Sequence, residues 1–316
     1  MKHRILGPLA MLALATASPA ANAESFALPT DGDLIGEHLE IVAAREDTFI
    51  DLARRHGLGY EELIHANPGV DPWLPGEGRV IRLPKQRILP DAPREGIVVN
   101  LAEHRLYYFP PAKAGEPRVV ITHPIAVGKM DWSTPIGLTR VTQKVKNPPW
   151  HPPESVRKAR AQRGESLPRV VPPGPDNPLG TRMMRLAIPG GAYLIHGTND
   201  PRGIGMQATH GCLRLYPEDI ESLFELVPVD MPVNIVNQPH KVGWRDGRLY
   251  VEVHPPLEST DGRVFEPGRT ELARLVAQAV RARPAAAVVW ERAETAFERS
   301  EGVPVAVTTA MVAALR

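Results

Sequence analysis

The chain has 316 residues, a formal net charge of +1, an apolar fraction of 43% and a single cysteine. The near-zero charge excludes a whole-molecule electrostatic attraction to nucleic acid or to anionic lipid. One cysteine excludes an intramolecular disulfide, and 34 prolines favour strands, turns and rigid loops over a helical bundle. The length predicts two or three domains.

The N-terminus has the composition of a secretory signal peptide. Basic residues 2–4 precede a mostly apolar run over residues 5–15, and Ala21-Asn22-Ala23 matches an A-x-A cleavage pattern. The apolar run is too short to span a bilayer, and no later segment has about 20 consecutive apolar residues. Residues 1–23 are therefore predicted to be a signal peptide, and we expect an exported, soluble protein without a membrane span.

Residues 38–84 are predicted to form a small β-α-α-β module. Alternating Leu39, Ile41 and Ala43 indicate a strand, and a helix cap at Asp47 or Thr48 precedes apolar residues at helical spacing. The segments that carry a family likeness are Asp47-Thr48-Phe49, Leu52-Ala53, Asn67-Pro68-Gly69, Leu74-Pro75-Gly76 and Leu83-Pro84. Their order resembles a LysM module, which implies binding to N-acetylglucosamine-containing glycan. The alternative is a spacer that binds nothing.

Residues 95–237 are predicted to form a mainly β domain, because short strand-like runs alternate with turn residues. The runs are residues 97–99, 105–109, 119–122, 138–142, 183–187, 193–196 and 233–236. One clear helix is expected to begin at Pro217, with Ile220, Leu223 and Phe224 on one face.

A proline-rich segment, residues 147–178, interrupts this domain and carries Arg163 and Arg169. A long loop with so much fixed backbone geometry favours a binding flap, and a plain surface insertion is the alternative.

The region 238–316 is predicted to be a mixed α/β accessory region. A strand over residues 249–253, a helix around residues 272–280 and a strand-like run over residues 303–307 follow one another, with no pattern that indicates chemistry.

The candidate chemistry lies around Cys212. A predicted strand leads into His196-Gly197-Thr198, and His210-Gly211-Cys212 follows. A free thiol titrates near about 8.5, so a cysteine nucleophile needs a neighbouring base such as an imidazole. Gly211 would leave backbone N–H groups accessible to an oxyanion. Two alternatives are a zinc site made by His196, His210 and Cys212, and an inert buried thiol packed by histidines.

These segments resemble the signature of the L,D-transpeptidases, the YkuD-domain family. The likeness is carried by Ile195-His196-Gly197-Thr198-Asn199, Gly203-Ile204-Gly205 and Thr209-His210-Gly211-Cys212-Leu213-Arg214-Leu215. Residues 96–109, 163–168, 173–178 and 249–257 further resemble the ErfK/YbiS group, which also carries a LysM-like module. Thr209 stands where serine is frequent in the family.

The resemblance implies a YkuD-type β-sandwich in which Cys212 forms a thioester with the third stem-peptide residue of peptidoglycan, usually meso-diaminopimelate, and releases D-alanine. It implies His196 as general base oriented by the Gly197 carbonyl, and the N–H groups of Gly211 and Cys212 as oxyanion hole. His210 would line the site. Arg214 and Thr209 would contact the substrate, with Arg163 and Arg169 as further candidates. No metal and no cofactor are implied.

The same resemblance implies a periplasmic enzyme whose partners are stem peptides and glycan strands of peptidoglycan. The acyl acceptor is expected to be the terminal lysine of an outer-membrane lipoprotein; the alternatives are a second diaminopimelate, giving a 3→3 cross-link, and water. A non-catalytic wall-binding protein is a second class of function. A papain-like or NlpC-like endopeptidase is a third, but there the cysteine precedes its histidine and begins a helix.

Overall fold

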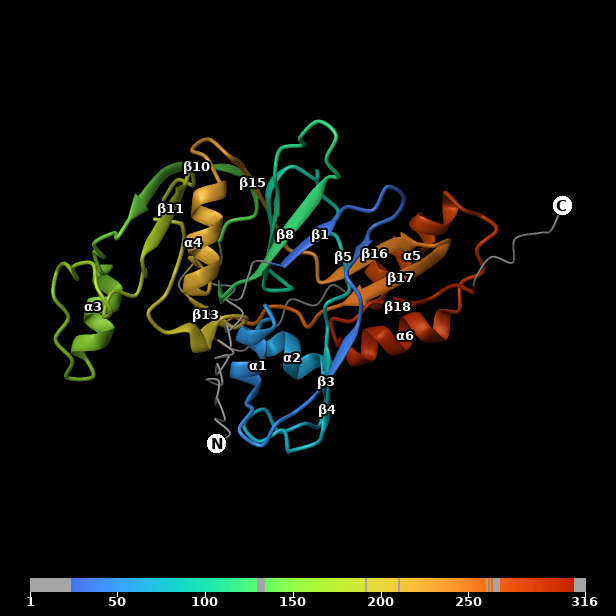
Figure 1. Cartoon of the computed structure of the whole chain (residues 1–316), viewed down its shortest axis with the longest axis horizontal. Helices are drawn as coiled ribbons and strands as arrows, with labels where there is room; N and C mark the ends of the chain where they lie inside the picture. Colours follow the sequence, from blue (N-terminus) through green and yellow to red (C-terminus); the bar gives the residue numbers. More distant parts are fainter. Residues whose placement is uncertain are drawn as a thin grey trace, which may run out of the picture.

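The computed structural model describes residues 24–129, 134–190, 192–209, 211–259, 261, 263 and 268–309. The predicted signal peptide, residues 1–23, lies outside these residues. Across the described part of the chain strands are more numerous than helices (Figure 1), which confirms the predicted mainly β fold.

Four elements near the N-terminus enclose a small core of their own. They are β3 (Leu39–Val42), α1 (Phe49–Arg55), α2 (Tyr60–Ala66) and β4 (Val80–Leu83), and β3 pairs antiparallel with β4. Phe49 and Leu63 from the helices and Ile81 from β4 are fully buried in this core. The Thr48 Oγ1 accepts a hydrogen bond from the Asp51 N–H at 3.2 Å, which caps α1 as its sequence predicts. We refer to residues 38–84 as the N-terminal unit.

A nine-stranded sheet forms the centre of the molecule, in the order β1-β8-β7-β6-β15-β10-β11-β12-β14. Its strands are β1 (Glu24–Ala27), β6 (Gly96–Asn100), β7 (Arg105–Phe109), β8 (Val119–Pro124), β10 (Gly137–Lys146), β11 (Arg182–Leu186), β12 (Leu194–His196), β14 (Leu213–Arg214) and β15 (Pro232–Val236). Neighbouring strands are antiparallel except for the pairs β6/β15 and β12/β14, which are parallel.

The long strand β10 belongs to both halves of this sheet. Its first residues pair with β15 and its last residues pair with β11, and the register shifts between Val141 and Gln143. A bulge of this kind bends a strand. Residues from both halves therefore share one core, in which Val99 and Ile195 pack together with Leu223 of α4 (Pro217–Leu226).

A second, smaller sheet lies beyond the central one. β16 (His240–Arg245), β17 (Arg248–Val253) and β18 (Val305–Ala306) form it, and α5 (Arg269–Arg281) and α6 (Trp290–Arg299) share its core (Figure 1). Two short strands, β2 (Leu34–Ile35) and β5 (Arg87–Ile88), pair with each other beside it. β16 and α6 had no counterpart among the elements expected from the sequence.

The N-terminal unit packs directly against the central sheet through charged groups. Glu62 of α2 accepts hydrogen bonds from Arg87 and Arg105, each at 2.6 Å, and both arginine side chains are almost fully buried. Burial alone would raise the pKa of Glu62, but Arg105 and Arg87 outweigh it and lower that pKa to about 2. Arg54 of α1 makes a second, more exposed ion pair with Glu218 of α4 at 2.9 Å.

No helix among the described residues is long and apolar enough to cross a membrane.

Candidate active site

Main-chain pairing places His196 beside the strand that follows the cysteine. β12 and β14 run parallel with His196 opposite Arg214, and the Leu215 N–H donates to the His196 carbonyl at 2.9 Å. A Cβ on Gly197 would lie 3.0 Å from the Ile220 Cγ2 of α4. Glycine therefore allows the chain after the histidine to pack closely under this helix.

Two hydroxyl groups hold the turn from Thr209 to Cys212. The Thr209 Oγ1 donates to the Cys212 carbonyl at 2.7 Å, and the Thr134 Oγ1 donates to the Gly211 carbonyl at 2.9 Å. Gly211 has a φ of 96°, which glycine adopts without strain. The carbonyl and the N–H of a trans peptide point in opposite directions, so the bond from Thr134 directs the Cys212 N–H away from Thr134. Within the described part of the chain no backbone group accepts from this N–H. His210 lies outside the described residues.

The Cys212 thiol is half-buried and protonated at neutral pH. Burial raises its pKa, and the opposing effects of the Leu194 backbone and of the Arg214 and Arg185 cations do not cancel this rise. Among the described residues, the Cys212 Sγ donates a hydrogen bond to the Ala192 carbonyl at 3.6 Å. Attack by this sulfur therefore needs a base that removes its proton.

His196 has the properties of such a base. Burial, with a further contribution from Arg214, lowers the pKa of His196 to about 3, so the imidazole is neutral at neutral pH. The His196 Nδ1 lies 2.6 Å from the Gly197 carbonyl oxygen. A carbonyl only accepts hydrogen bonds, so the Nδ1 carries the proton and the Nε2 keeps its lone pair.

Arg214 brings an unpaired cation to the site. Burial lowers its pKa, which the nearby Cys212 and Asp200 partly offset. Its Nε is buried without a hydrogen-bond partner, and among the described residues its side chain makes no ion pair, because Asp200 pairs with Arg202 at 2.8 Å instead. Arg214 is half-buried, and a buried polar atom without a partner is costly, so this group is suited to receive a carboxylate from a substrate.

The proline-rich segment 147–178 reaches the site through Trp150. Trp150 forms a bridge with Val171 and packs against the same apolar cluster as Cys212. The fully buried Asn177 ties the segment together, since its Nδ2 donates to the Pro148 carbonyl at 2.8 Å and lies within 3.3 Å of two further carbonyls. The segment is therefore an anchored structure that packs one aromatic ring against the apolar cluster that Cys212 also contacts.

This segment also contains a helix that its sequence did not predict, α3 (Glu154–Ala161). Arg163 and Arg169 follow α3, and their side chains are exposed. Neither arginine makes an ion pair with any of the described residues. Sequence reasoning missed Ala192 and Arg185, which lie near Cys212, and Trp150, which packs against the same cluster, because each lies at least 20 residues away along the chain.

Potential metal ligands gather elsewhere. In the described ranges, the group with suitable geometry is Glu103, Glu252 and His254, and it does not include Cys212 or His196. Lys241 already occupies this group, with its Nζ 2.5 Å from Glu103 and 2.8 Å from Glu252. The cluster is therefore a buried ion network.

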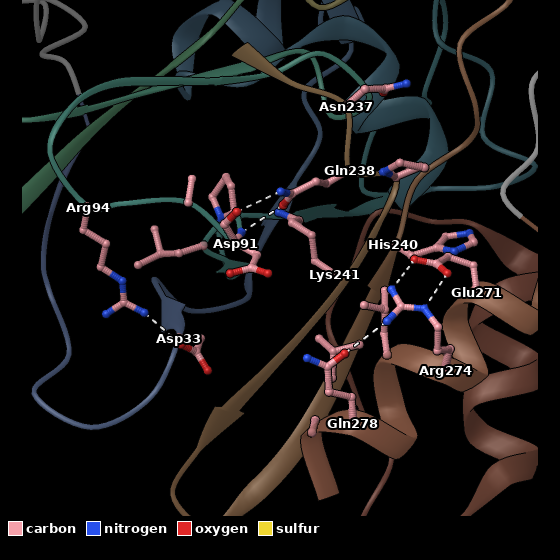
Figure 2. Close-up of a pocket in the computed structure, with 17 residues that line it drawn as sticks. Asp33, Asp91, Arg94, Asn237, Gln238, His240, Lys241, Glu271, Arg274 and Gln278 are labelled. Atoms are coloured by element: carbon pink, nitrogen blue, oxygen red, sulfur yellow. Dashed lines mark hydrogen bonds and ion pairs between the residues drawn. The ribbon is translucent and has the colours of Figure 1, made fainter. Parts of the chain in front are cut away.

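A polar cavity of about 560 Å³ also lies apart from the cysteine (Figure 2). It opens between residues 89–94, residues 237–242 and α5. Its charged groups pair with one another: Arg94 with Asp33 at 2.8 Å, and Arg274 with Glu271 at 2.7 Å. None of the candidate catalytic residues lines it, so the candidate active site remains the surface around Cys212.

Comparison with known proteins connects this geometry to one family. The model of the YkuD family, described as the L,D-transpeptidase catalytic domain, matches residues 94–235. Escherichia coli YcfS is 45% identical over 250 residues, covering 78% of this chain and 77% of YcfS. Escherichia coli ErfK/SrfK is 38% identical over 312 residues, covering 95% of this chain and 96% of that protein. Both are named as probable L,D-transpeptidases.

Solved structures are more distant. The catalytic domain of an Enterococcus faecium L,D-transpeptidase is 21% identical and covers 46% of this chain and 99% of that chain, with a TM-score of 0.33. The family assignment therefore rests on the sequence relatives, which are similar over most of their length. On that evidence, this chain belongs to the L,D-transpeptidase family defined by the YkuD catalytic domain.

Proposed function

We propose that the chain acts on peptidoglycan as a cysteine acyltransferase with Cys212 as its nucleophile. The Cys212 sulfur attacks the carbonyl carbon of the third stem-peptide residue, meso-diaminopimelate, and the bond to the terminal D-alanine breaks. D-alanine leaves as the free amino acid and the stem remains as a thioester. An amine then attacks this thioester, forms an amide and returns the thiol. The observation that carries this proposal is the pairing of the strand that ends in His196, whose buried imidazole is neutral, with the strand that follows the single cysteine.

His196 is the general base in this scheme. Its neutral Nε2 accepts the Cys212 proton as sulfur attacks and returns it to the departing D-alanine nitrogen. The bond from Nδ1 to the Gly197 carbonyl supports the role, because it fixes the tautomer and the orientation of the ring. The thiol now donates to the Ala192 carbonyl, so a rotation of the Cys212 side chain precedes proton transfer. We assign His210 to the wall of the site.

The amides of Gly211 and Cys212 form the oxyanion hole in the proposed mechanism. The direction of the Cys212 N–H, set by the bond from Thr134 to the preceding carbonyl, supports this role. A preorganised donor of this kind stabilises the negative oxygen of the tetrahedral intermediate more than it stabilises the substrate. Thr209 keeps the turn in place through its bond to the Cys212 carbonyl and contributes to the substrate surface.

Arg214 binds a carboxylate of the donor stem in this scheme, since its half-buried guanidinium makes no ion pair among the described residues. Trp150 forms the neighbouring wall, and the exposed Arg163 and Arg169 extend the charged surface on the flap.

Replacing Arg214 by lysine is expected to raise the donor KM by about 10- to 100-fold, because a charge-assisted bidentate contact contributes about 1.5–3 kcal/mol. Lysine keeps the positive charge beside the thiol, so alkylation of Cys212 by iodoacetamide should change less than twofold. Arg202→Lys is the matched control, since Arg202 is exposed and already paired with Asp200. Equal effects of the two substitutions on KM would contradict the assignment.

The N-terminal unit is proposed to be a LysM-like glycan-binding module that holds the enzyme on the wall. Trp73 is 60% exposed in the loop after α2, with its ring centroid 6.4 Å from that of Tyr60. Exposed aromatic rings of this kind suit the apolar faces of sugars. We assign residues 95–237 to the catalytic domain and 238–316 to an accessory region. With residues 1–23 as signal peptide, the enzyme is placed in the periplasm.

The acceptor is proposed to be the terminal lysine of an outer-membrane lipoprotein, which would tether that membrane to the wall. The test incubates purified tetrapeptide muropeptide with the enzyme, with and without a peptide that ends in this lysine. Mass spectrometry then identifies the products. The expected product is the muropeptide minus D-alanine plus the lysine peptide. A product joined through two diaminopimelates would favour 3→3 cross-linking, and a free tripeptide would favour hydrolysis. Absence of any D-alanine release would favour a non-catalytic wall-binding protein.

A further inference from the structure

We propose that the N-terminal unit positions the Cys212 turn for acyl transfer through the first turn of α2, which makes Gly59 and Tyr60 positioning residues. This inference rests on the proposed role of Cys212, and it is independent of whether the unit binds glycan.

The first amides of α2 donate to the catalytic domain. The Tyr60 N–H donates to the Ile204 carbonyl at 3.1 Å, and the Glu61 N–H donates to the Gly205 carbonyl at 3.3 Å. Amides in the first turn of a helix have no partner within the helix. Here their acceptors belong to the segment that leads into the Cys212 turn, so the helix end and this segment share one set of hydrogen bonds.

Two glycines allow this contact. A Cβ on Gly59 would lie 2.8 Å from the Gly205 Cα, and a Cβ on Gly205 would lie 2.3 Å from the Gly59 Cα. Gly59 has a φ of −87° and a ψ of 155°, which any residue adopts. Gly59 is therefore a glycine for reasons of space, and an added methyl group would push the two backbones apart.

Further backbone hydrogen bonds connect the contact between Gly59 and Gly205 to the residues around Cys212. The Gly205 N–H donates to the Ile125 carbonyl at 3.2 Å, and β13 (Gln207–Thr209) pairs with β9 (Val127–Gly128). Between them, Ala126 and Arg214 exchange two backbone hydrogen bonds, at 2.9 and 3.1 Å. Backbone pairing thus runs from α2 to Arg214, which lies opposite His196.

A second route passes along the chain itself. Only three residues separate Gly205 from Thr209, whose hydroxyl bonds to the Cys212 carbonyl. A shift of α2 against Gly205 therefore displaces both the turn that carries the sulfur and the strand that carries Arg214. Displacement of a reacting group by about 1 Å costs up to about 100-fold in rate.

The sharpest test compares Tyr60→Pro with Tyr60→Ala. Tyr60 is the first residue of α2, where proline is compatible with the helix. There the proline ring replaces the N–H that donates to Ile204, so the hydrogen bond is lost and the ring presses against that carbonyl. Both variants lose the Tyr60 ring, so their difference isolates the backbone contact. Single-turnover formation of the thioester with tetrapeptide muropeptide, followed by intact-protein mass, is expected to be about tenfold slower for Tyr60→Pro than for Tyr60→Ala.

A second pair of variants tests the glycine contact. Gly59→Ala is expected to slow thioester formation by about tenfold with little change in donor KM. Gly268→Ala is the matched control: Gly268 also precedes a helix, with a φ of −68°, and nothing lies within 4 Å of its added Cβ. Iodoacetamide alkylates the only cysteine in the chain. Its rate should remain within twofold in all four variants, because a small reagent needs access to the thiol but not its alignment with a bound stem peptide.

Thioester formation at the wild-type rate in both Tyr60→Pro and Gly59→Ala would overturn the inference. Loss of folded structure in both, with Gly268→Ala folded, would overturn it as well, since the contact would then serve stability only. If the wild-type protein itself forms no thioester at Cys212, the proposed function fails, and that result is distinct from either outcome.

Discussion

Replacing Cys212 by serine is expected to abolish thioester formation, with a loss in turnover of at least about 10⁴-fold. The sulfur must act as the attacking atom and later as the leaving group. A serine hydroxyl, whose pKa lies far above that of a thiol, does both poorly without a stronger base than a neutral imidazole. Intact-protein mass after incubation with tetrapeptide muropeptide measures the adduct directly, because no other cysteine can carry it.

The fold should survive this substitution. Serine is nearly isosteric with cysteine, and its hydroxyl can donate to the same Ala192 carbonyl that now accepts from the sulfur. The denaturation midpoint and the circular dichroism spectrum serve as controls and should match the wild-type values. A serine variant that still accumulates a covalent stem adduct at a comparable rate would remove Cys212 from the mechanism.

Replacing His196 by glutamine is expected to reduce turnover by about 10²- to 10⁴-fold, the usual effect of losing a general base. Glutamine is closer to histidine in volume than alanine is, so it preserves the packing of this buried position better. The pKa of His196 is about 3 and burial raises the pKa of Cys212, so both side chains are neutral at pH 7 in the free enzyme. Alkylation of the wild-type thiol should therefore rise steadily as the pH increases above neutral.

The pH dependence of Cys212 alkylation and of turnover distinguishes a general base at His196 from a residue that only lines the site at His210. High pH deprotonates the thiol without an imidazole, so alkylation of the His196→Gln variant should recover at alkaline pH. His210→Ala should lose muropeptide turnover through altered geometry, and raising the pH should restore less of it. If alkaline pH rescues alkylation in the His210 variant and not in the His196 variant, the base is His210.

Local sequence patterns predicted much of the fold. Seven of the nine strands of the central sheet lie within a few residues of their predicted positions, and β1 and β14 were not expected. The helix α4 begins at Pro217, as expected from proline at the first helical position. The strand β17 was predicted but β16, its partner in a hairpin, was missed. The turn between them is the type that an Asp-Gly pair favours, with positive φ at both Asp246 and Gly247. The polar run before that turn has no clear alternation, so the strand itself gave little signal.

The surroundings of the site were less accessible to sequence reasoning. The strand before His196 and the glycine before Cys212 are local features, and their pattern indicated a thiol site. Contacts between distant segments have no local pattern: Trp150 reaches the Cys212 cluster across 62 residues of sequence, and α2 meets Gly205 across more than 140. The same limit explains why the arginines of segment 147–178 were chosen as substrate contacts and Trp150, which shares an apolar cluster with Cys212, was not.

The burial of Arg87 and Arg105 around Glu62 has a consequence for how this chain can be recombined. Glu62 of the N-terminal unit neutralises two arginines that lie outside this unit. The surface of the unit and the surface that it contacts are therefore complementary in charge to each other and not to an unrelated module. An N-terminal unit transplanted from a relative would have to bring a carboxylate at the same place, or leave two buried cations opposing each other at a cost of several kcal/mol. The three charges therefore act as one set, and swapping modules among relatives should succeed only where the incoming unit and the recipient together supply the carboxylate and both arginines.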